Sequence, residues 1–86
     1  MNMQVTEEIV RVSLYAHGND ATGYLSTGEA LAAALILNRA DWLEQMNYTI
    51  VGALARIGET WAAALPNAEQ IVRKEIEQQE RSLHEG

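Results

Sequence analysis

The two histidines and a few carboxylates are the side chains of this 86-residue sequence that could bind a metal ion. His17 and Asp20 form an H-x-x-D pattern near the predicted end of a helix, and Glu44 or His84 would have to complete the coordination shell. Metal coordination demands several ligands in a fixed geometry. A histidine in the last turn of a helix is explained more simply by its favourable interaction with the helix dipole. We therefore predict no metal site and no cofactor.

Two pairs of carboxylates have a spacing that would suit general acid and base catalysis. Asp41 and Glu44 share one face of a predicted helix, and so do Glu77 and Glu80. Such catalysis needs a pocket that shifts the pKa of the groups, whereas both pairs are expected to be solvated. Phosphate-binding loops, zinc-protease patterns and the nucleophile-elbow motif are absent from the sequence. We predict that the protein is not an enzyme.

Three aromatic residues lie in the most apolar half of the chain: Trp42, Tyr48 and Trp61. Tryptophan is rarely fully buried and is enriched at the energetic centres of protein interfaces. Trp61 belongs to a periodic apolar stripe and is expected in the core, while Trp42 fits a core or an interface position equally. The three rings could alternatively line a small-molecule site.

The run from Asn38 to Leu43, N-R-A-D-W-L, lies between two apolar helices. Arg39 and Asp41 could pair and fix this corner, or the run could be exposed to a partner. The residues that we predict to contact a partner protein are Arg39, Asp41, Trp42, Glu44, Tyr48, Val72, Ile76 and Leu83.

Capping and turn residues divide the sequence into helices. Thr6 and Thr49 are expected N-caps, and Ser26 with Glu29 forms the S-x-x-E pattern of a capping box. Gly18 has the residue type that commonly follows a helix end. The predicted helices span residues 6–17, 27–37, 39–46, 49–65 and 67–83.

Pro66 is predicted to end the fourth helix, because proline restricts the preceding residue and lacks an N–H donor. Gly52 and Gly58 lie inside that helix, where each costs roughly 1 kcal/mol relative to alanine; a close helix contact at both would offset this cost. The helix over 27–37 is apolar on most sides, which predicts a central position. Val72, Ile76, Gln79 and Leu83 show a coiled-coil-like spacing, but it extends over too few residues to predict a coiled coil.

The predicted fold is all-α, a compact bundle of four to five short helices in a single domain over residues 1–86. The sequence is 48% apolar and has no cysteine, so helix packing has to stabilise it without disulfides. Its longest nearly uncharged run, residues 30–38, is far shorter than the roughly 20 residues of a membrane helix. The first residues, MNMQVTEE, do not resemble a signal peptide, and we expect a cytoplasmic protein.

The net charge of −6 argues against direct binding to nucleic acid, which requires cations that contact phosphates. We therefore expect a small non-enzymatic helical protein–protein interaction module that forms a homodimer or another homo-oligomer. The alternative is a small acidic inhibitor or adaptor, of the kind encoded by phages and mobile elements, that occupies the basic nucleic-acid-binding site of a partner. That function would require one continuous acidic surface formed by Asp41, Glu44, Glu69, Glu75, Glu77 and Glu80.

Overall fold

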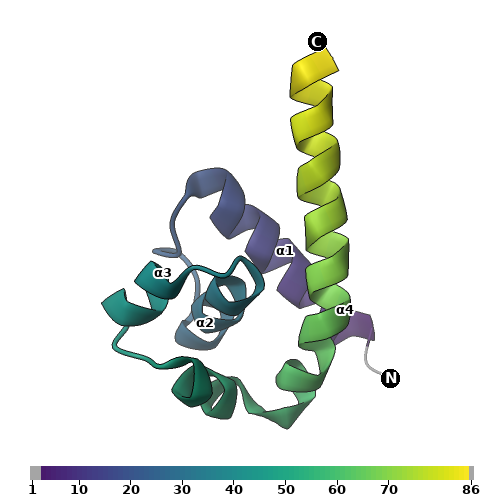
Figure 1. Ribbon diagram of the computed structural model, residues 1–86. Helices are drawn as coiled ribbons and strands as arrows, with labels where there is room; N and C mark the ends of the chain where they lie inside the picture. The colour runs from purple at the N-terminus through teal and green to yellow at the C-terminus, as the bar shows by residue number, and fades with distance from the viewer. Residues whose placement is uncertain (1–2, 86) are drawn as a thin grey trace.

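Helices form the whole regular structure of the described chain, which contains no strand (Figure 1). The computed structural model describes residues 3–85, with side chains as far as residue 82. The fold is all-α, as the sequence predicted, with four helices. They are α1 (Met3–Asn19), α2 (Thr27–Ile36), α3 (Ala40–Gln45) and α4 (Ile50–Glu85).

The short helix α2 lies at the centre of the molecule. The predicted capping box at its start is confirmed: the Glu29 N–H donates to the Ser26 hydroxyl at 3.3 Å, and the Ser26 N–H donates to a Glu29 carboxylate oxygen at 3.0 Å. Residues 30–34 are all buried, because α1, α3 and α4 each pack against α2. The apolar composition of this helix therefore reflects contacts on several sides, as expected for a central element.

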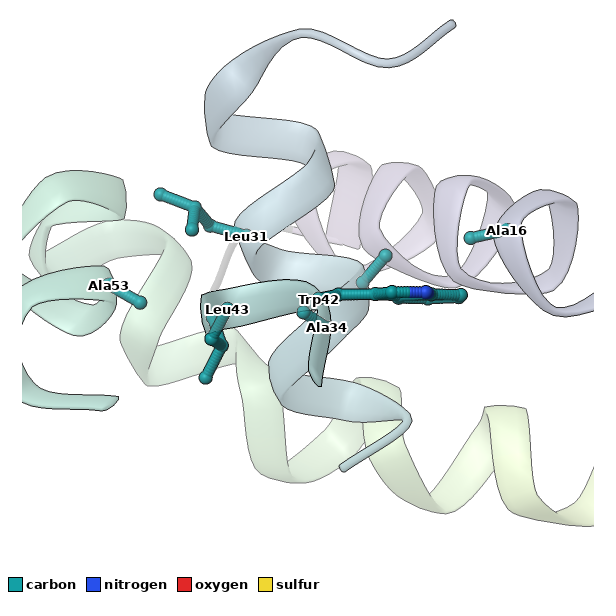
Figure 2. Close-up of a cluster of buried hydrophobic side chains, with 7 residues drawn as sticks. Ala16, Leu31, Ala34, Trp42, Leu43 and Ala53 are labelled. Carbon is teal, nitrogen blue, oxygen red and sulfur yellow. The ribbon is translucent and has the colours of Figure 1, made fainter. Parts of the chain in front are cut away.

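A first buried cluster joins α2 to α1, α3 and the start of α4 (Figure 2). The ring of Trp42 extends from α3 alongside Ala34 and toward Ala16 of α1. Trp42 is only 4% exposed, which places it in the core. The buried members of this first cluster are Ala16, Leu31, Ala33, Ala34, Trp42, Leu43 and Ala53.

A second buried cluster joins α1 and α2 to the later part of α4. Its alanines allow the helices to approach one another closely, and larger side chains from α1 and α4 fill the space between them. The buried members of this second cluster are Ile9, Ala32, Ile36, Ala68 and Val72. Trp61, Leu65 and Ile76 pack around it while remaining partly exposed.

The ends of α1 differ from the prediction. The helix begins at Met3 rather than near Thr6, because Val5 packs against the second cluster and extends the buried stripe of α1 by one turn. At the other end the helix continues through Gly18, and Asp20 adopts the left-handed conformation with φ 50°. Aspartate tolerates this region better than most residues do, so a glycine is not required there.

Gly58, rather than Pro66, interrupts α4, which corrects the prediction of two helices over 49–65 and 67–83. Pro66 is exposed and lies inside the helix, where it lacks the N–H that would donate to the Ala62 carbonyl. Gly58 has φ 86° and ψ 169°, so the chain turns sharply there and the following residues return onto α1 and α2 (Figure 1).

The predicted helix contacts at the α4 glycines do not occur. A Cβ atom at Gly52 would lie 3.1 Å from the hydroxyl of Thr49, within the same turn, and a Cβ atom at Gly58 would meet nothing within 4 Å. Thr49 caps this end of α4 by accepting a hydrogen bond from the Gly52 N–H at 2.9 Å. The two glycines thus serve the cap and the bend.

The last turns of α4 extend beyond the other helices (Figure 1). We call residues 77–85 the C-terminal arm; all of its described side chains, those of residues 77–82, are exposed. Across the described chain, no helix has both the length and the hydropathy needed to cross a membrane.

Candidate functional site

Arg39 lies at the corner between α2 and α3 and holds two carboxylates. Its Nε and Nη2 donate to the two oxygens of Asp41 at 2.9 and 2.8 Å, and its Nη1 donates to Asp20 at 2.8 Å. The guanidinium carbon lies 4.0 Å from the centre of the Trp42 ring, a cation–π distance. Asp20 belongs to the loop after α1, so this one side chain connects three segments of the chain.

The charged side chains at this corner form ion pairs with one another. The hydrogen bond from Arg39 lowers the pKa of Asp41, and the hydrogen bonds to Asp41 and Asp20 raise the pKa of Arg39. Because these side chains are partly exposed, solvent screens the ion pairs and each contributes little to stability. The structure shows the predicted Arg39–Asp41 pair at this corner, where Arg39 is half-buried and Asp41 is exposed.

The other predicted contact residues do not form one site. Glu44 is exposed on α3, and Tyr48 is half-buried against the first cluster. Val72 is 1% exposed and belongs to the second cluster of its own chain, where Ile76 packs beside it. The side chain of Leu83 lies outside the described residues.

The three aromatic residues do not line a common cavity. Trp42 and Tyr48 pack with the first cluster, whereas Trp61 packs with the second. Trp61 borders a groove of about 200 Å³ that also contains Glu8, Glu29 and Arg56. The hydrogen bond from the Ser26 N–H lowers the pKa of Glu29, which favours its ionised form. Glu29 therefore serves the helix cap, and the small-molecule site formed by three rings is not present.

Three of the six charged candidates for an acidic surface are paired with arginines, while Glu44, Glu75 and Glu80 are exposed. Asp41 binds Arg39, and along α4 Glu69 lies 3.7 Å from Arg73 and Glu77 lies 3.3 Å from Arg81. Among the described residues, no three His, Asp or Glu side chains are grouped to hold a metal ion.

The first two turns of α4 carry an apolar surface that the sequence pattern did not predict. Ile50 is 60% exposed, Val51 76% and Leu54 37%. Beside them a hollow of about 310 Å³ is lined by Leu35, Ile36, Ile50, Leu54, Leu65, Pro66 and Glu69. We call Ile50, Val51, Leu54 and this hollow the apolar surface.

The periodic apolar stripe of Trp61 also contains Ile50, Leu54 and Ile57. In an unbroken helix all of these side chains would lie on the core face. Gly58 was the available signal, since the bend there leaves Ile50 and Leu54 exposed beside the hollow while Trp61 and Leu65 pack against the second cluster. Of Ile50, Leu54 and Ile57, only Ile57 packs against the first cluster.

Comparison with protein-family models, with curated proteins and with solved structures gives no match.

Proposed function

We propose that this protein is a small non-enzymatic helical interaction module whose partner is a second copy of the same chain. The observation that carries the proposal is the apolar surface, where three large side chains of one helix end are exposed together. Single exposed apolar residues are normal on a protein surface, whereas a contiguous group beside a hollow is typical of an interaction site.

The apolar surface favours a partner that is recognised by shape and hydrophobicity rather than by charge. Its hollow contains one ionisable side chain, Glu69, and that carboxylate lies 3.7 Å from Arg73. Two copies of a chain with net charge −6 repel each other, and the repulsion is smallest where few charges meet. A twofold dimer would bury this surface against itself.

The charged corner supports a non-enzymatic role. The guanidinium of Arg39 is engaged by Asp41 and Asp20, and its face covers Trp42, so these groups act on one another. The second candidate, an acidic protein that occupies a basic site, draws no support from Asp41, Glu69 and Glu77, since each is paired with an arginine.

Val51→Glu tests the homodimer, because this side chain is 76% exposed and its replacement leaves the core intact. Burial of a valine contributes about 1.5–3 kcal/mol, and the substitution acts twice in a symmetric dimer. We therefore expect the dissociation constant, measured by sedimentation equilibrium, to rise at least about tenfold, the equivalent of roughly 1.4 kcal/mol.

Tyr24→Glu is the matched control, since Tyr24 is 93% exposed in the loop before α2, outside the apolar surface. The same charge placed there is expected to leave the dissociation constant within about twofold of the wild-type value. A wild-type chain that sediments as a monomer up to millimolar concentration contradicts the homodimer, and equal effects of the two variants contradict the assigned surface.

A further inference from the structure

We propose that the second half of α4 exchanges between two copies of this chain, with Gly58 as the hinge. In the exchanged dimer Gly58 is helical, α4 is one straight helix, and residues 61–76 of each copy pack on α1 and α2 of the other. This inference rests on the proposed homodimer and specifies how its two copies are joined.

The first observation is that a single residue separates the bent helix from a straight one. Gly58 is the one residue of α4 with non-helical torsion angles, φ 86° and ψ 169°. This region is accessible essentially to glycine alone. A Cβ atom there would meet nothing within 4 Å, so only the torsion angles, and no steric clash, oppose an alanine in the bent form. Rotation about two backbone bonds is enough to interconvert the two forms.

The second observation is a repeat of eleven residues that runs through the bend. Ile50, Trp61, Val72 and Leu83 are each eleven positions apart. Leu54, Leu65 and Ile76 form a second such row, and Ile57, Ala68 and Gln79 form a third.

A repeat of eleven residues corresponds to about 3.67 residues per turn, which keeps the three rows on one side of a helix that needs little supercoiling. Two helices joined by a bend have independent rotational phases, so the bent form does not require the phase to continue across Gly58. A straight α4 does require it, because its apolar stripe then lies along one face.

The third observation is that the bend leaves part of these rows uncovered. Leu65 and Ile76 pack against the second cluster, but Leu54 of the same row is 37% exposed. Val72 is buried, while Ile50 of its row is 60% exposed. In the straight helix Ile50 and Leu54 lie on the same face as Trp61 and Leu65. The two α4 helices of the dimer cross near the hinge, so the apolar stripe of each copy can cover that of the other.

The exchange preserves the core contacts. Ala68 and Val72 meet Ile9, Ala32 and Ile36 in both forms, and only the chain that supplies them changes. The equilibrium between the bent monomer and the exchanged dimer then depends on the hinge conformation, on the newly covered apolar surface and on the entropy lost on association. Concentration and substitutions at Gly58 therefore control which form is populated.

Gly58→Ala is the substitution expected to favour exchange. Alanine cannot readily adopt the bent torsion angles, and it stabilises the helical conformation relative to glycine in each of two chains. We expect the dissociation constant of the dimer to fall about thirty-fold or more. The opposite variant inserts Gly-Ser-Gly after Gly58, which relaxes the turn and is expected to raise the same constant at least about tenfold, because short hinges favour exchange.

Two measurements identify the exchanged form. The straight 36-residue α4 would be about 54 Å long, compared with a largest extent of 41 Å for the bent chain, so small-angle X-ray scattering should show a longer particle. For the second measurement, ¹³C-labelled and unlabelled chains are mixed in denaturant and refolded together. Isotope-filtered nuclear Overhauser spectra should then show magnetisation transfer from Ile9 of one copy to Val72 of the other. Leu31 and Leu43 lie on the same side of the hinge and provide the control within one chain.

Transfer between Ile9 and Val72 of different copies in Gly58→Ala, and its loss on Gly-Ser-Gly insertion, supports the exchange. A dimer that is weakened by Val51→Glu but shows Ile9–Val72 transfer within one chain only overturns the exchange and leaves the proposed function intact. Absence of any dimer in the wild type and in Gly58→Ala overturns both. If Gly58→Ala does not fold, refolded mixtures of the wild type at millimolar concentration decide by the same transfer: its presence supports the exchange and its absence overturns it.

Discussion

Ser13→Ala is predicted to stabilise the protein, because the Ser13 hydroxyl is buried without a partner. Ser13 is 0% exposed within α1, and its oxygen finds no hydrogen bond among the described residues. An unsatisfied buried polar group costs about 1–3 kcal/mol, and alanine has the highest helix propensity, exceeding that of serine by a few tenths of a kcal/mol. The substitution removes one oxygen atom and leaves a small void that offsets part of this gain.

We therefore expect the free energy of unfolding to rise by about 1–2 kcal/mol, measured by urea denaturation. For a domain of this size 1 kcal/mol corresponds to a shift of about 4–8 °C in Tm, so differential scanning calorimetry should register the change. Ser82→Ala is the matched control, since Ser82 is exposed on α4 and the same replacement there changes helix propensity alone. It is expected to alter stability by less than about 0.5 kcal/mol.

A loss of stability in Ser13→Ala would refute this reasoning. It would mean that the hydroxyl donates to a backbone carbonyl in the preceding turn of α1, as helical serines can do. Ser13→Val tests the packing around this position: it removes the hydroxyl and adds volume, so it should destabilise a core that is closely packed there.

The helix cap and the charged corner give two further predictions. Glu29→Gln should lower stability near neutral pH, and the loss should shrink as the pH falls below 4.5. The pKa of Glu29 is lowered in the folded state from an ordinary 4.5, so its contribution is present above that value and is lost as the pH falls through the lower folded pKa. Urea denaturation over a series of pH values measures this, and a loss that stays constant down to the acid limit of folding would contradict it. Arg39→Gln should raise the pKa of Asp41, which ¹³C NMR titration measures. It should also shift the fluorescence of Trp42 to longer wavelength, because the guanidinium no longer covers the ring. An unchanged Asp41 titration would show that the ion pair is absent in solution.

Local signals in the sequence predicted the parts of the fold that local interactions determine. Ser26 and Glu29 form their capping box within four residues, and Thr49 caps the start of α4 as its residue type predicts. The central position of α2 followed from its composition, because a helix without a polar face has to be covered on several sides.

The bend in α4 could not be located in this way. The local rule that proline ends a helix favoured Pro66, whereas packing of the later part of α4 on α1 and α2 requires the chain to reverse earlier. Pro66 is tolerated because it is exposed. The consequence for the candidate site is direct: with the bend at Gly58, Ile50 and Leu54 become surface residues instead of core.

The Arg39 corner was predictable in part. The proximity of Arg39 and Asp41 in the sequence suggested their pairing, but Asp20 lies nineteen residues away and joins the pair only because the loop after α1 returns to α3. Long-range contacts of this kind depend on the tertiary arrangement, which a local pattern does not contain.

The buried alanines of α2 also determine which sequences can share this fold. Ala32, Ala33 and Ala34 are each 0% exposed, and every added methylene group at such positions forces neighbouring helices apart, commonly at a cost of 1–3 kcal/mol. The described residues of the C-terminal arm, by contrast, are all exposed and can accept many side chains. In a library of random variants selected only for folding, α2 should retain its small residues while the arm diversifies.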